Sequence, residues 1–334
     1  MHVAAMSRVI VLLAIAPTVH VSDAAGTKGV TPSQPSFAPG TKVTSVEGPC
    51  LTFNGLRDAI IENVVIGPCA GNGIELFDSH NVTLRAVATS GTARSGIYIY
   101  GSSSIGIEES SISGGVSGVY AVNSSGVRVS CNSIESPRGP VPRGQLVQFD
   151  KASGEGNAIS CNIGRNTAGK GEPEDAISLY QSQGTPQSPI VVSNNLVVGG
   201  GPSETGGGIM LGDGGGSYQV AEGNDLVDPG QYGIAVASGD HMTIRNNRVY
   251  ARAQTFTNVG ISVWNQYPHA CRDITVEGNF VKWQSKTGRP NPYWNGGNCG
   301  PVTGIATNNF RAPVDPATLV ERSTACACRN NGRR

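Results

Sequence analysis

The chain has 334 residues with 24 basic and 24 acidic side chains, so it lacks the basic surplus that nucleic-acid or anionic-membrane partners require. Apolar residues make up 38% and charged residues 14%, a lean composition that does not favour a globular α/β enzyme. The 46 glycines show no period of three, which excludes a collagen-like protein.

The N-terminus has the pattern of a secretory signal peptide over residues 1–25. Arg8 precedes an apolar run at 9–16, and small residues follow up to Ala24 and Ala25. The run is too short to span a bilayer, and no later stretch could span one. We expect cleavage near Ala24 or Ala25 and a secreted or periplasmic protein. A buried N-terminal helix is the alternative interpretation.

Eight cysteines fit an exported protein, because an even number in an oxidising compartment suggests up to four disulfides. Their wide spacing differs from the paired spacing of a zinc site, so we interpret them as structural. Cys326 and Cys328 stand only two positions apart, and a bridge between them would be strained. They either pair elsewhere or remain free.

The next feature in chain order is a repeated phrase in which a small residue precedes alternating apolar residues. Such alternation predicts short strands with one buried face. The phrase begins at Gly73, Gly96, Gly118, Ala176, Gly208, Gly233 and Gly260, and the segment Leu146–Lys151 fills the gap between the third and the fourth.

A second phrase lies between these strands and ends in an asparagine. Its asparagines are 23 to 33 residues apart, and we expect them to form a ladder in which each side-chain amide bonds its neighbours in adjacent coils. Six unrelated turns are the alternative, since asparagine also favours turns. The residues concerned are Asn132, Asn162, Asn195, Asn224, Asn247 and Asn279.

A coil of about 22 to 33 residues with two or three short strands is one rung of a parallel β-helix. On these repeats, the sequence resembles the right-handed parallel β-helix proteins of the pectin-lyase-like superfamily. The resemblance predicts an all-β solenoid of about eight to ten coils over residues 48–310. Residues 26–47 would cap one end, and the tail at 311–334 would cover the other. The resemblance also implies carbohydrate chemistry.

Cysteine positions support this arrangement. Cys131 and Cys161 both precede a ladder asparagine in consecutive coils, which lie about 4.8 Å apart, so a disulfide could join them. Two stacked buried thiols are the alternative. Cys50–Cys69 and Cys271–Cys299 would tie the two ends of the stack.

Side chains that flank the apolar pair of each first strand should point outward and form a strip. Aromatic and polar side chains on such a face suit sugar binding, although strands also favour aromatics for packing. Insertions at 136–144, 164–174, 199–207 and 251–258 would wall a cleft over it. The substrate-binding candidates are Tyr98, Tyr100, Gln148, Glu174, Trp264, Asn265, His269 and Trp294.

Charged candidates concentrate on three consecutive coils, and the catalytic set is Lys151, Asp150, Asp175, Tyr180 and Asp213. One hypothesis is a polysaccharide lyase that cleaves a uronate-containing polymer by β-elimination. Lys151 would then be the base and Tyr180 the proton donor. The three aspartates could hold Ca²⁺.

A second hypothesis is a glycoside hydrolase that uses the same carboxylates as acid and base. A third is a non-catalytic polysaccharide-binding or adhesion protein, since Asp and Lys at strand ends often only cap turns. In each case we expect a monomer with a polysaccharide partner, without a nucleic-acid partner or a membrane span.

Overall fold

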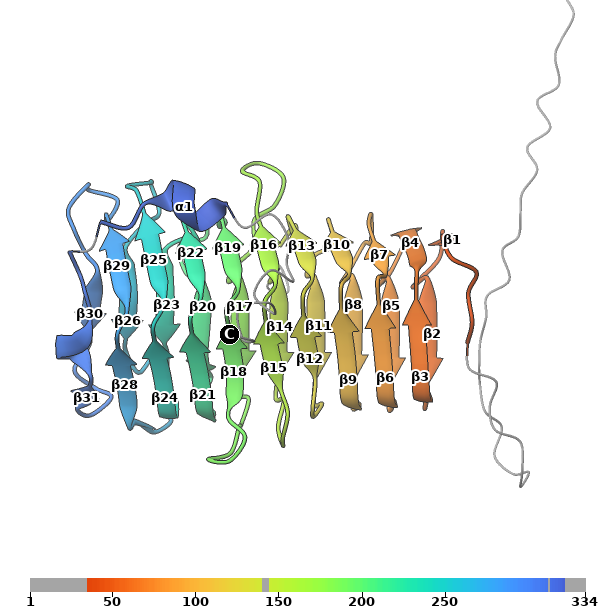
Figure 1. Ribbon diagram of the computed structural model, residues 1–334, viewed down its shortest axis with the longest axis horizontal. Helices are drawn as coiled ribbons and strands as arrows, with labels where there is room; N and C mark the ends of the chain where they lie inside the picture. Colours follow the sequence, from red (N-terminus) through yellow and green to blue (C-terminus); the bar gives the residue numbers. More distant parts are fainter. Residues whose placement is uncertain (1–34, 140–143, 312, 322–334) are drawn as a thin grey trace, which may run out of the picture.

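Successive strands join three different sheets in strict rotation, and each three-strand coil stacks on the one before it (Figure 1). The computed structural model describes residues 35–139, 144–311 and 313–321. The predicted signal peptide, Cys326 and Cys328 lie outside these residues. All strand pairings between neighbouring coils are parallel, so the predicted parallel β-helix is confirmed.

Sheet A contains the repeated first strands and will carry the candidate site. Its 10 strands, in spatial order, are β2 (Leu51–Asn54), β5 (Ile74–Phe77), β8 (Ile97–Tyr100), β11 (Val119–Val122), β14 (Val147–Asp150), β17 (Ile177–Tyr180), β20 (Ile209–Asp213), β23 (Tyr232–Val236), β26 (Val259–Val263) and β30 (Tyr293–Asn295).

The strands of sheet B come directly after the ladder asparagines in the sequence. Its 10 strands are β1 (Thr41–Ser45), β4 (Val64–Cys69), β7 (Ala88–Thr89), β10 (Ser111–Ser113), β13 (Ser133–Glu135), β16 (Ile163–Arg165), β19 (Leu196–Val198), β22 (Asp225–Val227), β25 (Arg248–Ala251) and β29 (Phe280–Trp283).

Sheet C lies between sheets A and B along each coil. Its strands are β3 (Arg57–Glu62), β6 (His80–Arg85), β9 (Ser103–Glu108), β12 (Arg128–Ser130), β15 (Ala158–Ser160), β18 (Ile190–Ser193), β21 (Ser217–Glu222), β24 (Gly239–Arg245), β28 (Ile274–Glu277) and β31 (Val302–Thr303), with β27 (Cys271–Arg272) beside β24.

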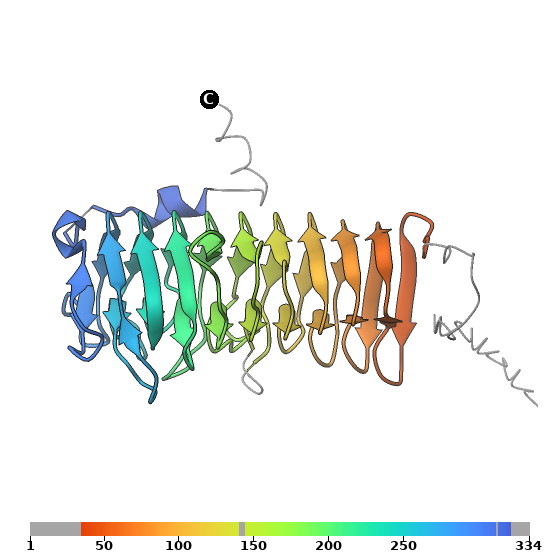
Figure 2. The ribbon, with the colours of Figure 1, turned by 90° about the horizontal axis from the view of Figure 1, so that it is seen from below.

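The core is a set of apolar columns inside the stack, which forms an elongated rod in both views (Figures 1 and 2). In sheet A the register aligns one inward residue per coil, and each is at most 5% exposed. Because single coils cannot bury this face alone, stacking supplies the hydrophobic stabilisation. The column runs through Leu51, Ile74, Ile97, Val119, Val147, Ile177, Ile209, Ile234 and Ile261.

The predicted asparagine ladder is present at the corner between sheets C and B. At Asn224, the side-chain nitrogen donates to Val192 O and to Asn247 Oδ1, both at 2.9 Å. Its Oδ1 accepts from the backbone and side-chain nitrogens of Asn195, both at 3.0 Å. The ladder continues one coil beyond the predicted set, to Asn308.

Two predicted disulfides are confirmed, Cys50–Cys69 and Cys271–Cys299. Cys131 and Cys161 are also disulfide-bonded, and their pairing with each other stays a prediction. Among the described residues, no cysteine is free. The described part of the chain also has no helix long and apolar enough to cross a membrane.

We expected the C-terminal tail to lie over the end of the stack, but its described part does not lie there. Helix α1 (Pro316–Val320) packs instead on the outer side of sheet B, where Leu319 and Val314 cluster with Val227 (Figure 1). The C-terminal coil is closed by η1 (Ile305–Thr307) and by Phe310, whose ring stacks on Tyr293 at 5.5 Å. The apolar side chains of the tail explain the difference, because the tail turns back from the last coil and Val314 and Leu319 pack against Val227 of β22.

The ladder gives the first testable prediction. Replacing Asn224 with Ala should lower the free energy of unfolding by about 2–4 kcal/mol, because buried backbone and amide groups on both neighbouring coils lose their partners. Asn54→Ala is the control, because Asn54 is an exposed residue at the end of β2. Urea unfolding followed by circular dichroism measures both. Equal losses in the two variants would contradict the role of the ladder.

Candidate functional site

The outer face of sheet A carries the predicted strip as two columns in register. One column contains Glu75, Tyr98, Tyr120, Gln148, Ser178, Met210, Ala235, Ser262 and Trp294. The other contains Phe77, Tyr100, Val122, Asp150, Tyr180 and Asp213. The strip is exposed at its ends and buried at its middle, where Gln148 and Ser178 are at most 1% exposed.

A bulge in β20 places Asp213 in the strip. The register with β17 shifts so that Tyr180 lies opposite Asp213 and one extra residue, Gly212, is accommodated. Gly212 has φ +65°, and a Cβ there would lie 1.9 Å from the Ser238 carbonyl oxygen, so only glycine fits. The glycine thus turns Asp213 to the outer face.

Asp213 is held by hydroxyl donors from two other segments. The Tyr267 hydroxyl donates to its Oδ1 at 2.6 Å, and the Ser178 hydroxyl donates to its Oδ2 at 3.2 Å. The carboxyl is only 5% exposed. Both oxygens therefore accept hydrogen bonds in a largely dry position, which orients the group firmly.

Asp175, just before β17, is the most perturbed carboxyl of the site. Burial raises its pKa to about 7, and the charges of Asp213 and Glu174 act in the same direction. Hydrogen bonds from the Tyr232 hydroxyl and the Gly207 backbone N–H act in the opposite direction. The result is a carboxyl poised to hold or release a proton near neutral pH.

Tyr232 reaches Asp175 across an intervening coil because that coil has a glycine there. A Cβ on Gly207 would lie 2.7 Å from Cγ of the Tyr232 ring. Burial raises the pKa of the Tyr232 phenol well above its ordinary value, so the phenol stays a donor. The sequence analysis missed both Tyr232 and Tyr267, because their contacts with the aspartates join positions 57 and 54 residues apart.

Tyr232 also lines a hollow of about 510 Å³, the tryptophan hollow. Its walls include Trp264 and Trp294, whose rings meet edge to face at 5.9 Å and which are each 45% exposed. The insertions contribute as predicted, with Thr205 and Asn258 in the lining. Thr205 also donates to Glu174 Oε1 at 2.8 Å, which holds the insertion at 199–207 near Asp175.

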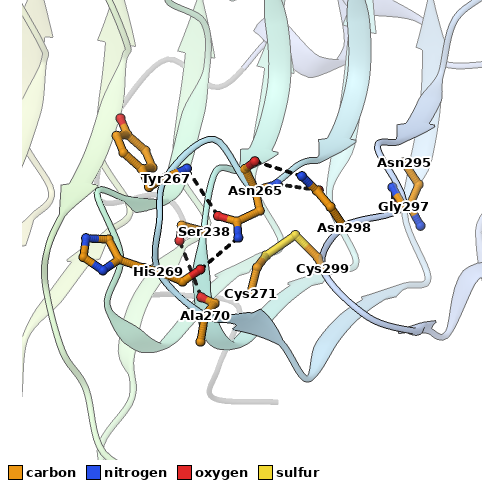
Figure 3. Close-up of a disulfide and its surroundings, with 10 residues drawn as sticks. All are labelled: Ser238, Asn265, Tyr267, His269, Ala270, Cys271, Asn295, Gly297, Asn298 and Cys299. Carbon is orange, nitrogen blue, oxygen red and sulfur yellow. Dashed lines mark hydrogen bonds between the residues drawn. A yellow bond between two sulfur atoms is a disulfide. The ribbon is translucent and has the colours of Figure 1, made fainter.

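Lys151 lines a different hollow, of about 640 Å³, which we call the lysine hollow. Its lining includes Lys151, Gln181, Gly214, Gly215, Gly216 and His269. Asn265 Nδ2 donates to the His269 carbonyl at 2.8 Å and thereby shapes the loop that carries the imidazole (Figure 3). The structure thus brings Lys151 and His269 together and assigns Asn265 a supporting contact.

Asp150 and Gln148 lie on β14, where they pair in register with Tyr180 and Ser178 of β17. Tyr120 donates to Asp150 Oδ2 at 2.9 Å. Within the described residues, the other Asp150 oxygen and the Gln148 amide oxygen are buried without a hydrogen-bond partner. Such atoms suit the hydroxyls of a bound sugar, because an unpartnered buried acceptor is costly.

Tyr98 lies further along, in a hollow of about 710 Å³ with Glu75 and Tyr120. Its ring contacts Tyr120 edge to face at 5.7 Å. Tyr100 is 41% exposed beside it. These tyrosines form an aromatic extension of the strip toward the N-terminal coils.

The three aspartates suggested as calcium ligands do not form a metal-binding group. Among the described residues, no three His, Cys, Asp or Glu side chains are grouped to hold a metal ion. Hydroxyl and N–H donors also occupy oxygens of Asp175 and Asp213 that a cation would need. These residues do not fit Ca²⁺, and no step below depends on it.

Comparisons with known proteins agree with the fold. The model of the family described as right-handed β-helix region matches residues 50–222. No curated protein sequence matches this chain. The catalytic domain of an α-1,3-glucanase of glycoside hydrolase family 87, solved with tetrasaccharides, superposes with a TM-score of 0.53 and 13% identity. The match covers 80% of this chain and 59% of the glucanase, so the chain spans less than two thirds of that protein.

Two further solved structures are similar at lower scores. A tailspike protein of E. coli bacteriophage HK620, in complex with a pentasaccharide, has a TM-score of 0.44 and 11% identity, over 77% of this chain and 57% of its own. Alginate lyase AlyF-OU02 has a TM-score of 0.43 and 16% identity, over 76% and 56%.

The buried carboxyl gives a prediction on pH and stability. Asp175 titrates at about 7 in the fold and at about 4 in the unfolded chain, so the fold loses stability as the pH rises between these values. Asp175→Asn should abolish this loss and raise the melting temperature more at pH 8 than at pH 4. Calorimetry at both pH values measures it.

Glu155→Gln is the control for that experiment, because Glu155 is exposed and its neutralisation should not change the pH dependence. If Asp175→Asn shifted the melting temperature equally at both pH values, the carboxyl would not titrate in this window.

Proposed function

The chain belongs to the right-handed β-helix family, and on that premise we propose that it is a secreted carbohydrate-active enzyme that hydrolyses glycosidic bonds of a polysaccharide bound along the outer face of sheet A. The observation that carries the proposal is the pair Asp175 and Asp213. They lie on neighbouring coils, and their environments differ in the way that acid and base roles require.

Asp175 is the acid of this pair. With a pKa of about 7, it keeps a proton under conditions in which an ordinary carboxyl has lost it. Tyr232 contacts Asp175 with its hydroxyl and also lines the tryptophan hollow. When Asp175 holds its proton, its O–H can donate to the Tyr232 oxygen. The phenol then gives its own proton to the leaving sugar oxygen and takes the proton of Asp175 in the same step, which leaves Asp175 as a carboxylate.

Asp213 is the base or nucleophile. Its two hydroxyl donors fix the carboxylate while the bond to the sugar breaks, and the same residue is within the electrostatic reach of Asp175. In an inverting reaction Asp213 activates water, whereas in a retaining one it attacks the sugar carbon itself.

The remaining strip binds the polymer. Trp264 and Trp294 offer exposed rings at one end, and Tyr100 does so at the other, beside the half-buried Tyr98. Aromatic rings contact the C–H faces of sugars, while the free acceptors of Gln148 and Asp150 suit sugar hydroxyls. The disulfides at both ends of the stack are consistent with export.

A second candidate function, β-elimination on a uronate polymer, is favoured by the lysine hollow. Lys151 is exposed there next to His269, so its amine could take the proton beside a uronate carboxylate while the imidazole balances the charge. Tyr180, whose hydroxyl accepts from Gln181 at 3.0 Å, would donate to the leaving group.

The test uses purified mature protein on polygalacturonate, alginate, xylan and soluble α-1,3-glucan. Reducing ends and the ultraviolet absorbance of unsaturated uronates are followed together, with and without a chelator. We expect reducing ends without absorbance on at least one polymer, and no effect of the chelator. Absorbance that rises with reducing ends would overturn hydrolysis and favour elimination, and Lys151→Ala should then abolish turnover but keep binding.

Two substitutions test the assigned roles. Asp175→Asn and Asp213→Asn should each lower kcat by about a thousandfold with little change in polymer binding, because each removes a proton-transfer or nucleophilic group. Glu172→Gln is the matched control, since Glu172 is an exposed carboxylate on the insertion that precedes Asp175. Full activity in both aspartate variants would contradict the assignment. If the protein bound a polymer without cleaving it, the result would favour the third hypothesis, a non-catalytic polysaccharide-binding protein.

A further inference from the structure

A hollow of about 580 Å³ lies on the outer face of sheet C, away from the columns of sheet A. We call it the threonine hollow. None of its lining belongs to the site described above. It is lined by Pro186, Pro189, Tyr218, Val220, His241, Thr243, Arg272, Asp273, Ile274, Thr275, Pro301 and Thr303.

The floor of the hollow is one register column. Val220 pairs with Thr243, Thr243 with Thr275, and Thr275 with Thr303. Four coils at about 4.8 Å spacing make a floor about 14 Å long, which is more than one sugar ring. The three threonines offer hydroxyls that can both donate and accept, and Thr275 and Thr303 already share one hydrogen bond at 3.0 Å.

An aromatic stack forms one wall. The rings of Tyr218 and His241 lie on neighbouring coils with centroids 4.3 Å apart and planes 20° apart. Both residues have left-handed backbone, with φ of 50° and 57°. Pro186 and Pro189 lie on the Tyr218 side, on the insertion between β17 and β18. Flat, rigid apolar surfaces of this kind contact sugar rings at low entropic cost.

Charged groups continue this wall beside His241, whose ring nitrogens lie 3.5 and 3.8 Å from carboxylate oxygens of Asp240 and Asp273. Arg272 lies 3.7 Å from carboxylate oxygens of both Asp240 and Asp273, and Arg272 and Asp273 are 66% and 57% exposed. These separations exceed a hydrogen bond, so the guanidinium keeps donors for a ligand. The two carboxylates, of Asp240 and Asp273, outweigh the single charge of Arg272, so the rim disfavours an anion, and its polar groups suit a hydroxyl-rich ligand.

A disulfide joins two segments of the rim of the hollow. Cys271 immediately precedes Arg272, and Cys299 lies two positions before Pro301. The bridge joins these two rim segments, and Asn265 and Asn298 reinforce it with hydrogen bonds of 2.9 and 3.0 Å (Figure 3). A site with a fixed rim loses little entropy on binding.

We propose that the threonine hollow is a second saccharide-binding site, which holds a neutral stretch of a polysaccharide chain on the opposite side of sheet C from the core. The ring stack and prolines contact the sugar faces, and the threonines with Arg272 and Asp273 bond the hydroxyls. The inference rests on the proposed function only for the chemical class of the ligand, and it needs no cleavage at Asp175 or Asp213.

The experiment is affinity electrophoresis in native gels that contain xylan or soluble α-1,3-glucan. All proteins carry Asp213→Asn, so that the polymer stays intact. We expect Tyr218→Ala to weaken retardation by about three- to tenfold, as for the loss of one aromatic contact. Arg272→Ala should weaken it to a smaller extent. Phe280→Ala is the matched control, because Phe280 is an exposed aromatic on sheet B and should leave binding unchanged.

Three results overturn the inference. They are the absence of retardation on both polymers, equal retardation of Tyr218→Ala and its parent, and a loss of the same size in Phe280→Ala. Melting temperatures of the variants identify any loss that comes from unfolding. Cleavage by Tyr218→Ala, in a chain with Asp213 intact, is measured separately on short oligosaccharides. The rate of this cleavage should equal that of the parent protein. A lack of cleavage in both proteins would count against the proposed catalytic function and not against the second binding site.

Discussion

Hydrogen bonds between neighbouring coils fix the register of the strands, and so decide which side chains of neighbouring coils lie in line along the rod. Each strand pairs in parallel with the strand one coil away, and the asparagine ladder repeats this constraint at one corner with buried amides. A shift of one residue would turn an inward column outward and expose the core. The ladder makes such a shift unfavourable, because four side-chain bonds at Asn224 would be lost together.

The candidate site consists of local departures from this regular stacking. The bulge at Gly212 moves Asp213 onto the outer face, and the missing side chain at Gly207 lets Tyr232 reach Asp175 across a coil. Both departures occur where insertions cover the sheet. The covered middle of the strip is dry enough to raise the pKa of Asp175, whereas the tyrosines and tryptophans at its ends stay exposed for a polymer. The regular coils thus form the strip on sheet A, and the irregular ones position the candidate carboxyls Asp175 and Asp213.

Much of the fold could be predicted from the sequence, because the same sequence pattern recurs in each coil. Alternating apolar residues and spaced asparagines fixed the strands of sheet A and the ladder, and Cys50–Cys69 and Cys271–Cys299 followed from the ends of the stack. The site was less accessible. Asp175 and Asp213 could be located on neighbouring coils, but the donors Tyr232 and Tyr267 lie more than fifty residues from the aspartates that they contact. Tyr232 stands at the start of the predicted Gly233 strand, but no local pattern shows that its ring crosses a coil at Gly207, and Tyr267 lies on an irregular loop. The presence of Lys151 and His269 in one hollow likewise depends on an irregular loop, which carries His269.

One segment, 264–273, links the two faces that we propose to bind saccharides. It supplies Trp264 and Tyr267 to the site on sheet A and Arg272 and Asp273 to the threonine hollow on sheet C. The Cys271–Cys299 disulfide and the Asn265–Asn298 hydrogen bonds fix it to the next coil (Figure 3). Because these contacts tie the segment to the next coil, we expect the two surfaces to keep a constant separation. A polymer chain held at the threonine hollow is therefore presented to the catalytic face at a fixed distance, which raises its local concentration there without altering the catalytic residues.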